Sequence, residues 1–250
     1  MSDPAERGEE SLISHLLELR SRLLRALMAV MLVFLGLLPF ADRLYTWLAA
    51  PMIQSLPKGD ELVATGILSP FSVPLTLAFF TAIMLAMPFV LYQLWAFVAP
   101  GLYQHEKKLA RPLLVSATAL FYIGCAFTYY LLLPVMLNYL GTTAPEGVRR
   151  LPDISSYLDF AAVMFIAGGL SFEVPVAVLV TVILGWVTPA QLAEWRGYVI
   201  VAIFIIAAII TPPDGLSQVM LAVPMCLLYE VGILLARMLR RRADRAATQE

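Results

Sequence analysis

The residues that could catalyse a reaction do not occur in the spacing that common catalytic motifs require. His105 and Glu106 begin like a zinc-protease HExxH motif, but Leu109 stands where the second histidine is needed. Ser171 lies in the stretch GLSFE, which lacks the final glycine of a nucleophile elbow. His15 and His105 are the two histidines of the chain, and it has no GxxxxGK[ST] phosphate loop. We therefore expect no catalytic residue, no metal and no cofactor, and we do not expect an enzyme.

Acidic side chains close to apolar stretches are the better candidates, for binding rather than catalysis. Glu18 lies four residues before Arg22, and Glu106 lies in a basic loop, so an ordinary exposed ion pair competes with a ligand-binding role at each. Glu173 lies in the middle of an apolar stretch, where a charged side chain costs about 2.5–3.5 kcal/mol. We expect Glu173 to face the interior of a helical bundle, either as a structural hydrogen-bonding group or as a functional one.

Polar groups also gather around the last apolar stretch. Asp214 follows a proline-rich turn and is placed to cap the helix that begins there. Gln218 lies one turn further on and is a candidate docking point for a partner helix. Glu230 is nearer the other end of the stretch, where snorkelling or pairing with Arg237 predicts a structural role.

The elements that must position these residues are apolar throughout. The chain has 250 residues, of which 60% are hydrophobic and 14% charged, whereas a soluble domain carries about 25% charged residues. A surface with so few charges is typical of a protein that faces lipid. The net charge of −1 gives no basic field for nucleic acid. Cys125 and Cys226 lie in apolar runs and are interpreted as packing residues.

Six apolar stretches are bounded by charges or by proline and glycine, and we expect each to be a membrane-spanning helix. The chain is thus predicted to be an all-α, polytopic single membrane domain over residues 1–250, with an amphipathic interfacial helix at residues 11–25 that turns into the first span. The fifth stretch is short for a membrane core. The long connections at 41–70 and 141–156 are expected to form ordered caps. The predicted spans are 23–40, 71–98, 112–140, 157–186, 198–211 and 216–236, followed by a basic tail at 237–250.

The basic residues predict the orientation of these spans. Thirteen of the 17 Lys and Arg residues fall in the N-terminal segment, the second and fourth connections and the tail, which all lie on one side if six spans are present. The positive-inside rule places that side, and both termini, in the cytoplasm.

Several motifs, in order along nearly the whole chain, resemble the TatC family, the core subunit of the twin-arginine protein translocase. They are HLLELRSRL (15–23), Pro51, SPF (69–71), LYQLWAFVAPGLYQHEKK (91–108), FYIGCAFTYY (121–130), TAPEGV (143–148), DISSYL (153–158), SFEVPVAV (171–178) and TPPDGLSQ (211–218). Gly66 and Thr76 depart from the family pattern, in which charged residues are common at these positions.

The resemblance implies a signal-peptide receptor of a bacterial inner membrane that moves folded precursor proteins across it with the proton-motive force. It implies single-span partner subunits of the TatA and TatB type, precursors with twin-arginine signal peptides, and a homo-oligomer in the receptor complex. It also implies residue roles: signal-peptide binding by Glu18, Arg20, Phe97 and Glu106; a buried carboxylate at Glu173; partner-helix docking at Thr211, Asp214 and Gln218; and an outer cap at Pro51.

The physical reading agrees with this assignment, because carboxylates bind guanidinium groups in bidentate, charge-assisted pairs. Two other functions remain open at the level of sequence. A small-solute or ion transporter would use Glu173 as a proton relay, although the chain lacks inverted repeats and a second buried charge. A structural scaffold would assemble single-span proteins without binding cargo itself.

Overall fold

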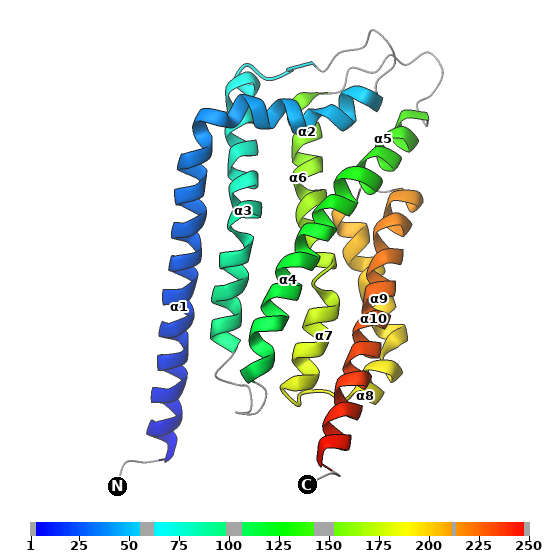
Figure 1. Ribbon diagram of the computed structural model, residues 1–250. Coiled ribbons are helices and arrows are strands. Elements are labelled where there is room, and N and C mark those ends of the chain that lie inside the picture. Colours follow the sequence, from blue (N-terminus) through cyan, green and yellow to red (C-terminus); the bar gives the residue numbers. More distant parts are fainter. Residues whose placement is uncertain (1–3, 56–62, 99–106, 143–152, 212–213, 248–250) are drawn as a thin grey trace.

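The computed structural model describes residues 4–55, 63–98, 107–142, 153–211 and 214–247. Within these ranges the regular elements are all helical, and one isolated bridge joins Val63 to Asp153. The helices form an upright bundle with one helix lying across its upper end (Figure 1). The predicted all-α fold is confirmed.

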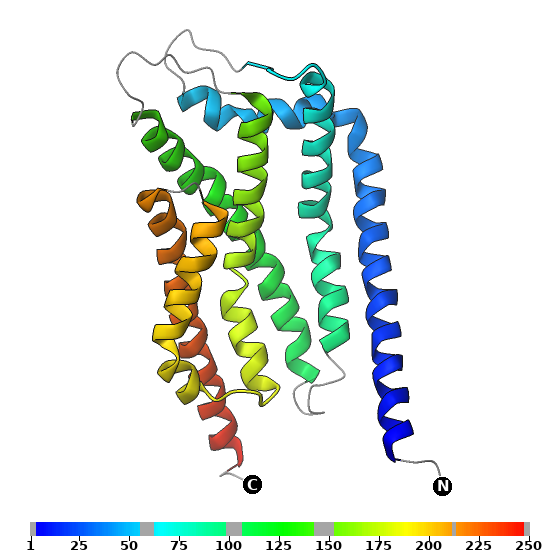
Figure 2. The same cartoon turned by 180° about the vertical axis from the view of Figure 1, so that it is seen from behind.

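The first upright helix is longer than predicted. Helix α1 runs without a break over Pro4–Leu37, so the expected turn between an interfacial helix and the first span does not occur. A short 3₁₀ turn (Leu38–Phe40) then leads into α2 (Ala41–Ser55), which lies across the upper end of the bundle (Figures 1 and 2). The first outer connection is therefore an ordered cap over residues 41–55, as predicted.

Proline residues shape the next two spans. Helix α3 (Ser69–Val98) contains Pro74 and Pro88 and packs beside α1. The third span consists of α4 (Lys107–Phe127), a π-helical turn η3 (Thr128–Leu132) and α5 (Leu133–Thr142). Pro134 has no N–H to donate to the carbonyl four residues earlier, which accounts for the wider turn just before it.

The fourth span is broken at its middle. It comprises α6 (Ile154–Ser171) and α7 (Val174–Ile183), with Phe172 and Glu173 between them. Pro175 explains the break, because its ring would clash with the carbonyl of Ser171 in a continuous helix. The sequence predicted one stretch over 157–186, so the break places Glu173 at a helix start rather than inside a helix.

The last part of the chain forms a helical hairpin. A short helix α8 (Pro189–Glu194), closed by a capping box between Thr188 and Gln191, precedes α9 (Arg196–Ile210) and α10 (Gly215–Ala247). Helix α10 continues well beyond the predicted end at 236, because the basic tail is helical as far as Ala247. The upper ends of α9 and α10 stop well below α2 in both side views (Figures 1 and 2).

Five helical segments are long and apolar enough to cross a membrane, and they correspond to the predicted spans other than the fifth. The fifth, α9, has 15 residues, or about 22 Å at 1.5 Å per residue, which is shorter than a hydrocarbon core of about 30 Å. The first turn of α1 and the last turn of α10 lie at the same end of the bundle, called here the inner end (Figure 1). An even number of passes requires this arrangement.

Close packing holds the centre of the bundle together. The fully buried large side chains come mainly from α4, η3, α5 and α6, and include Phe121, Leu132, Met136 and Met164. Helices α4 and α6 approach closely at Gly124 and Gly168: a Cβ at Gly124 would lie 2.6 Å from the carbonyl oxygen of Gly168. Small residues let helix backbones approach in lipid, where packing rather than hydrophobic burial drives association.

Candidate functional site

The inner end of α1 is attached to the inner end of α3 by an aromatic contact. The rings of His15 and Phe97 stack with their centroids 4.3 Å apart and their planes 26° apart. Phe97 was predicted as a site residue from the family resemblance, whereas His15 was not. The signal that could have found His15 is its position three residues before Glu18, which puts both on one face of α1.

Glu18 already holds a guanidinium group. Its Oε1 accepts hydrogen bonds from Arg22 Nε at 2.9 Å and Arg22 Nη2 at 2.5 Å. The Glu18 side chain stays 38% exposed and that of Arg22 is 21% exposed, so solvent reaches the pair. The ion pair considered in the sequence analysis therefore forms. It also shows that the carboxylate lies where a guanidinium can approach it.

The faces of α1 are arranged for lipid rather than water. The predicted polar face carries Glu18 and Arg22 and is the partly covered one, whereas Leu16 and Leu23 on the other face are exposed. Arg20 is also exposed, and two residues after Glu18 it points to a different side of the helix. The structure therefore groups Glu18, Arg22, His15 and Phe97, while Arg20 stands apart from them.

Glu106, the second predicted carboxylate of this site, lies outside the described residues. Its neighbour Lys107 begins α4 at the inner end of the bundle (Figure 1).

Glu173 lies in an apolar cavity between the inner half of α3 and the broken fourth span. The cavity has a volume of about 310 Å³, and its lining includes Trp95, Leu91 and Val176. Glu173 Oε1 is buried and has no hydrogen-bond partner among the described residues. The structural alternative, a hydrogen bond to a neighbouring helix, is therefore not what the described residues show.

The three predicted docking residues gather where α9 meets α10. Asp214 Oδ1 accepts the backbone N–H of Ser217 at 2.7 Å, which confirms Asp214 as the helix cap. Gln218 Nε2 donates to the carbonyl of Phe204 on α9 at 2.9 Å, and Thr211 Oγ1 donates to its own helix. Asp214 Oδ2 and Ser217 Oγ are buried with no partner in the described parts of the chain.

The outer cap is fastened to the bundle by polar contacts. Pro51 lies in α2, and the hydroxyl of Tyr157 on α6 donates to the α2 carbonyl of Leu48 at 2.9 Å. Asp153 accepts from the backbone N–H groups of Ser156 and Thr65, and these bonds lower the pKa of its carboxyl to about 2. The segment before α3, which contains Thr65, is thereby joined to the start of α6.

Both departures from the family pattern lie near this cap. A Cβ at Gly66 would lie 2.5 Å from Ser69 Oγ, so a side chain there would have to displace the Ser69 hydroxyl. Thr76 follows within α3 and is half-buried.

Glu230 is paired, but not with the expected residue. Its two oxygens accept from Arg196 Nε at 2.6 Å and Arg196 Nη2 at 2.8 Å, which links α10 to the start of α9. The predicted pair with Arg237 is therefore wrong, because an arginine from a neighbouring helix lies closer than one two turns along α10.

No group of three or more His, Cys, Asp or Glu residues that could hold a metal occurs in the described parts of the chain. The arrangement at the inner end can bind cationic groups through Glu18, and it brings together no nucleophile and base.

Comparisons with known proteins agree with this picture. A profile of the family described as Sec-independent protein translocase protein (TatC) matches residues 14–224. The chain is 48% identical to TatC of Haemophilus influenzae over 96% of this chain and 94% of that protein. It is 46% identical to TatC of Escherichia coli K12 over 91% and 88%. The TatC of Halothiobacillus neapolitanus is 49% identical over 98% of this chain and 67% of that protein.

Two crystal structures titled as the twin-arginine translocase receptor TatC have the same fold. They superpose with TM-scores of 0.79 and 0.81 at 35% and 34% identity, and the matches cover 90% and 89% of this chain and 98% and 99% of theirs. The chain therefore belongs to the TatC family, and it is a non-enzymatic membrane subunit of Sec-independent protein translocation.

Proposed function

We propose that the chain is the signal-peptide receptor of a twin-arginine translocase, and that Glu18 binds the paired arginines of the signal peptide. The single observation that carries this proposal is the geometry of Glu18, a partly exposed carboxylate that already accepts two hydrogen bonds from a guanidinium. An arginine of the signal peptide would replace Arg22 in the same geometry. Glu106 would hold the second arginine.

The surroundings of Glu18 fit a peptide that is basic at one end and apolar along the rest. The stacked His15 and Phe97 rings lie one turn from Glu18. On the other face of α1, exposed leucines that include Leu16 and Leu23 extend an apolar surface from the same level. The apolar part of the signal peptide would follow the spans, while the arginines stay at the inner end.

The junction of α9 and α10 is proposed as the docking place for single-span subunits of the TatA and TatB type. Exposed apolar side chains at this junction, Ile209 on α9 and Leu216 and Val219 on α10, offer a surface against which a single apolar helix can pack. Gln218 donates to the Phe204 carbonyl and so links α10 to α9, whereas Thr211 bonds within α9.

The proposed location is the bacterial inner membrane, with both termini in the cytoplasm. The charge asymmetry supports this orientation, since basic residues such as Arg237, Arg240 and Arg241 lie at the inner end. The protein would act as a homo-oligomer within the receptor complex and would use the proton-motive force to move folded precursors. The transporter alternative is not favoured, because no second ionisable residue lines the Glu173 cavity within the described residues.

The proposal is tested by binding of a fluorescent twin-arginine signal peptide to the full chain in nanodiscs. Glu18→Gln should raise the Kd tenfold or more, since it removes charge-assisted hydrogen bonds worth about 1.5–3 kcal/mol each, reduced by solvent exposure. Glu194→Gln is the matched control, because Glu194 is an exposed carboxylate at the same end of the bundle and has no partner at the site.

A second peptide with two lysines replacing the arginines completes the experiment. It should bind the unaltered chain weakly, and Glu18→Gln should change its Kd little, because an ammonium group cannot make the bidentate contact. Equal binding of both peptides, or equal losses in the Glu18 and Glu194 variants, would refute the proposal.

A further inference from the structure

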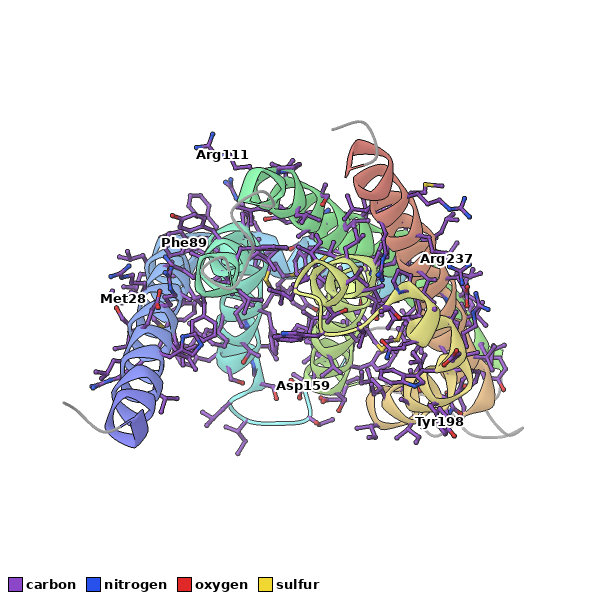
Figure 3. All side chains as sticks on the ribbon, turned by 90° about the horizontal axis from the view of Figure 1, so that it is seen from below. Met28, Phe89, Arg111, Asp159, Tyr198 and Arg237 are labelled. Atoms are coloured by element: carbon purple, nitrogen blue, oxygen red, sulfur yellow. The ribbon has the colours of Figure 1, made fainter. Side chains whose placement is uncertain are left out.

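A hollow of about 500 Å³ at the inner end of the bundle lies between α8 and the end of α10. Thr188, Pro189 and Ala190 form one wall, and Arg237, Arg240 and Arg241 form the other. Figure 3, which views the molecule from this end, shows Arg237 on α10 beside α8. The three arginines have the spacing i, i+3 and i+4, which places them on one face of the helix.

These arginines form no ion pair with any side chain that the structure describes. The two ion pairs found there are Glu18–Arg22 and Arg196–Glu230. Glu230, which lies two turns before Arg237 on α10, is held by Arg196 through both oxygens. Three guanidinium groups thus face one hollow. Asp244, further along α10, has a side chain outside the described part of the chain, and one carboxylate against three guanidinium groups still leaves a net positive charge.

Exposed aromatic residues indicate the level in the membrane at which the hollow lies. Trp186, Trp195 and Tyr198 flank α8 at this end of the bundle and are 74%, 46% and 81% exposed. Tryptophan and tyrosine at such positions typically lie at the level of the lipid headgroups. The arginines of the hollow therefore lie in the layer where lipid phosphates are found.

The surface of α10 next to the hollow is apolar. Leu234, Leu235 and Met238 are each at least 40% exposed and lie in the same turns as Arg237. Inorganic phosphate has no apolar part to contact such a surface, whereas a phospholipid would place its acyl chains along it. Guanidinium groups bind phosphate oxygens in bidentate pairs, and basic pockets at the inner ends of spans are typical headgroup sites.

We propose that the hollow between α8 and α10 is a binding site for the phosphate group of an anionic phospholipid, with Arg237, Arg240 and Arg241 as its ligands. A bound lipid would bridge α8 to α10 and so steady the α9–α10 hairpin. This site is separate from Glu18, so a negative result for lipid binding would not affect the signal-peptide proposal.

The test measures lipid binding to the full chain in detergent by native mass spectrometry, with phosphatidylglycerol as the probe. Arg237→Gln combined with Arg240→Gln should raise the Kd of one tightly bound lipid about ten- to thirtyfold, since each basic side chain near an anionic lipid contributes a factor of about five. The matched control combines Arg25→Gln with Arg111→Gln, which removes two exposed arginines elsewhere. It should leave that Kd within twofold of the original value.

Three further arms decide between the explanations. Arg237→Lys with Arg240→Lys keeps the charge but loses the bidentate contact, so it should lose less affinity than the glutamine variant. This partial retention excludes loss of the fold as the cause. Phosphatidylcholine should bind weakly, and inorganic phosphate should not displace phosphatidylglycerol. Equal losses in the control variant, displacement by inorganic phosphate, or equal binding of phosphatidylcholine would each overturn the proposal.

Discussion

The close approach of α4 and α6 predicts that Gly168→Ala destabilises the protein. A Cβ at position 168 would overlap the hydroxyl of Thr128 and would lie 3.2 Å from Thr128 Cβ and 3.3 Å from the carbonyl oxygen of Gly124. Thr128 is completely buried, and its hydroxyl donates to that Gly124 carbonyl at 2.9 Å. The added methyl group has no free space, so either the hydroxyl or the helix must move.

The expected size of the effect follows from three contributions. Overpacking a core costs about 1–3 kcal/mol, and losing the Thr128 hydrogen bond costs about 1 kcal/mol. The higher helix propensity of alanine returns about 1 kcal/mol. The net loss in the free energy of unfolding is therefore about 1–3 kcal/mol.

The measurement is unfolding of the full chain in mixed micelles by titration with sodium dodecyl sulfate. Gly36→Ala is the control, because a Cβ at Gly36 would meet nothing within 4 Å, and it should leave stability unchanged or raise it slightly. Thr128→Ala in combination with Gly168→Ala removes the overlapping hydroxyl. The double variant should then be more stable than the sum of the single losses predicts, by about 1 kcal/mol or more.

Additive losses in the double variant would show that Thr128 is not what Gly168 accommodates. A Gly168→Ala protein as stable as the Gly36→Ala protein would refute the packing argument altogether.

Two further predictions concern the outer cap. Tyr157→Phe removes the hydroxyl that donates to the Leu48 carbonyl, so the free energy of unfolding in the same titration should fall by about 1 kcal/mol. Asp153→Asn tests pH dependence. Because hydrogen bonds lower the pKa of Asp153 from the ordinary value of about 4 to about 2, its contribution is complete above pH 4 and is lost as the pH falls toward 2. The thermal midpoint of the original chain should therefore fall more steeply between pH 5 and pH 2 than that of the Asp153→Asn chain, and parallel curves would contradict the assignment.

Local composition was enough to predict the spans, because a helix in lipid satisfies its own backbone hydrogen bonds and needs only apolar side chains over a sufficient length. The cap formed by Asp214 is local in the same sense, since its partner Ser217 is three residues away. The Glu18–Arg22 pair, one helical turn apart, was likewise open to prediction.

Tertiary structure decided the features that depend on residues far apart in the chain. Glu230 pairs with Arg196, 34 residues away, instead of Arg237, because α9 and α10 fold back on each other. His15 contacts Phe97 only because α1 packs beside α3. Hydropathy cannot predict such pairs, since the same apolar spans could pack in other orders.

The faces of α1 and the break at Glu173 show most clearly what local sequence predicts and what tertiary packing decides. Polar and apolar residues on different faces of the segment predicted an amphipathic helix. In the structure the leucines face outward and Glu18 faces the bundle. The packing of α1 against α3 decides which face is covered. Pro175 explains the break between α6 and α7, but the sequence predicted one unbroken span over 157–186. The apolar cavity that the break opens around Glu173 requires α3 as its other wall, and so it exists only in the folded bundle.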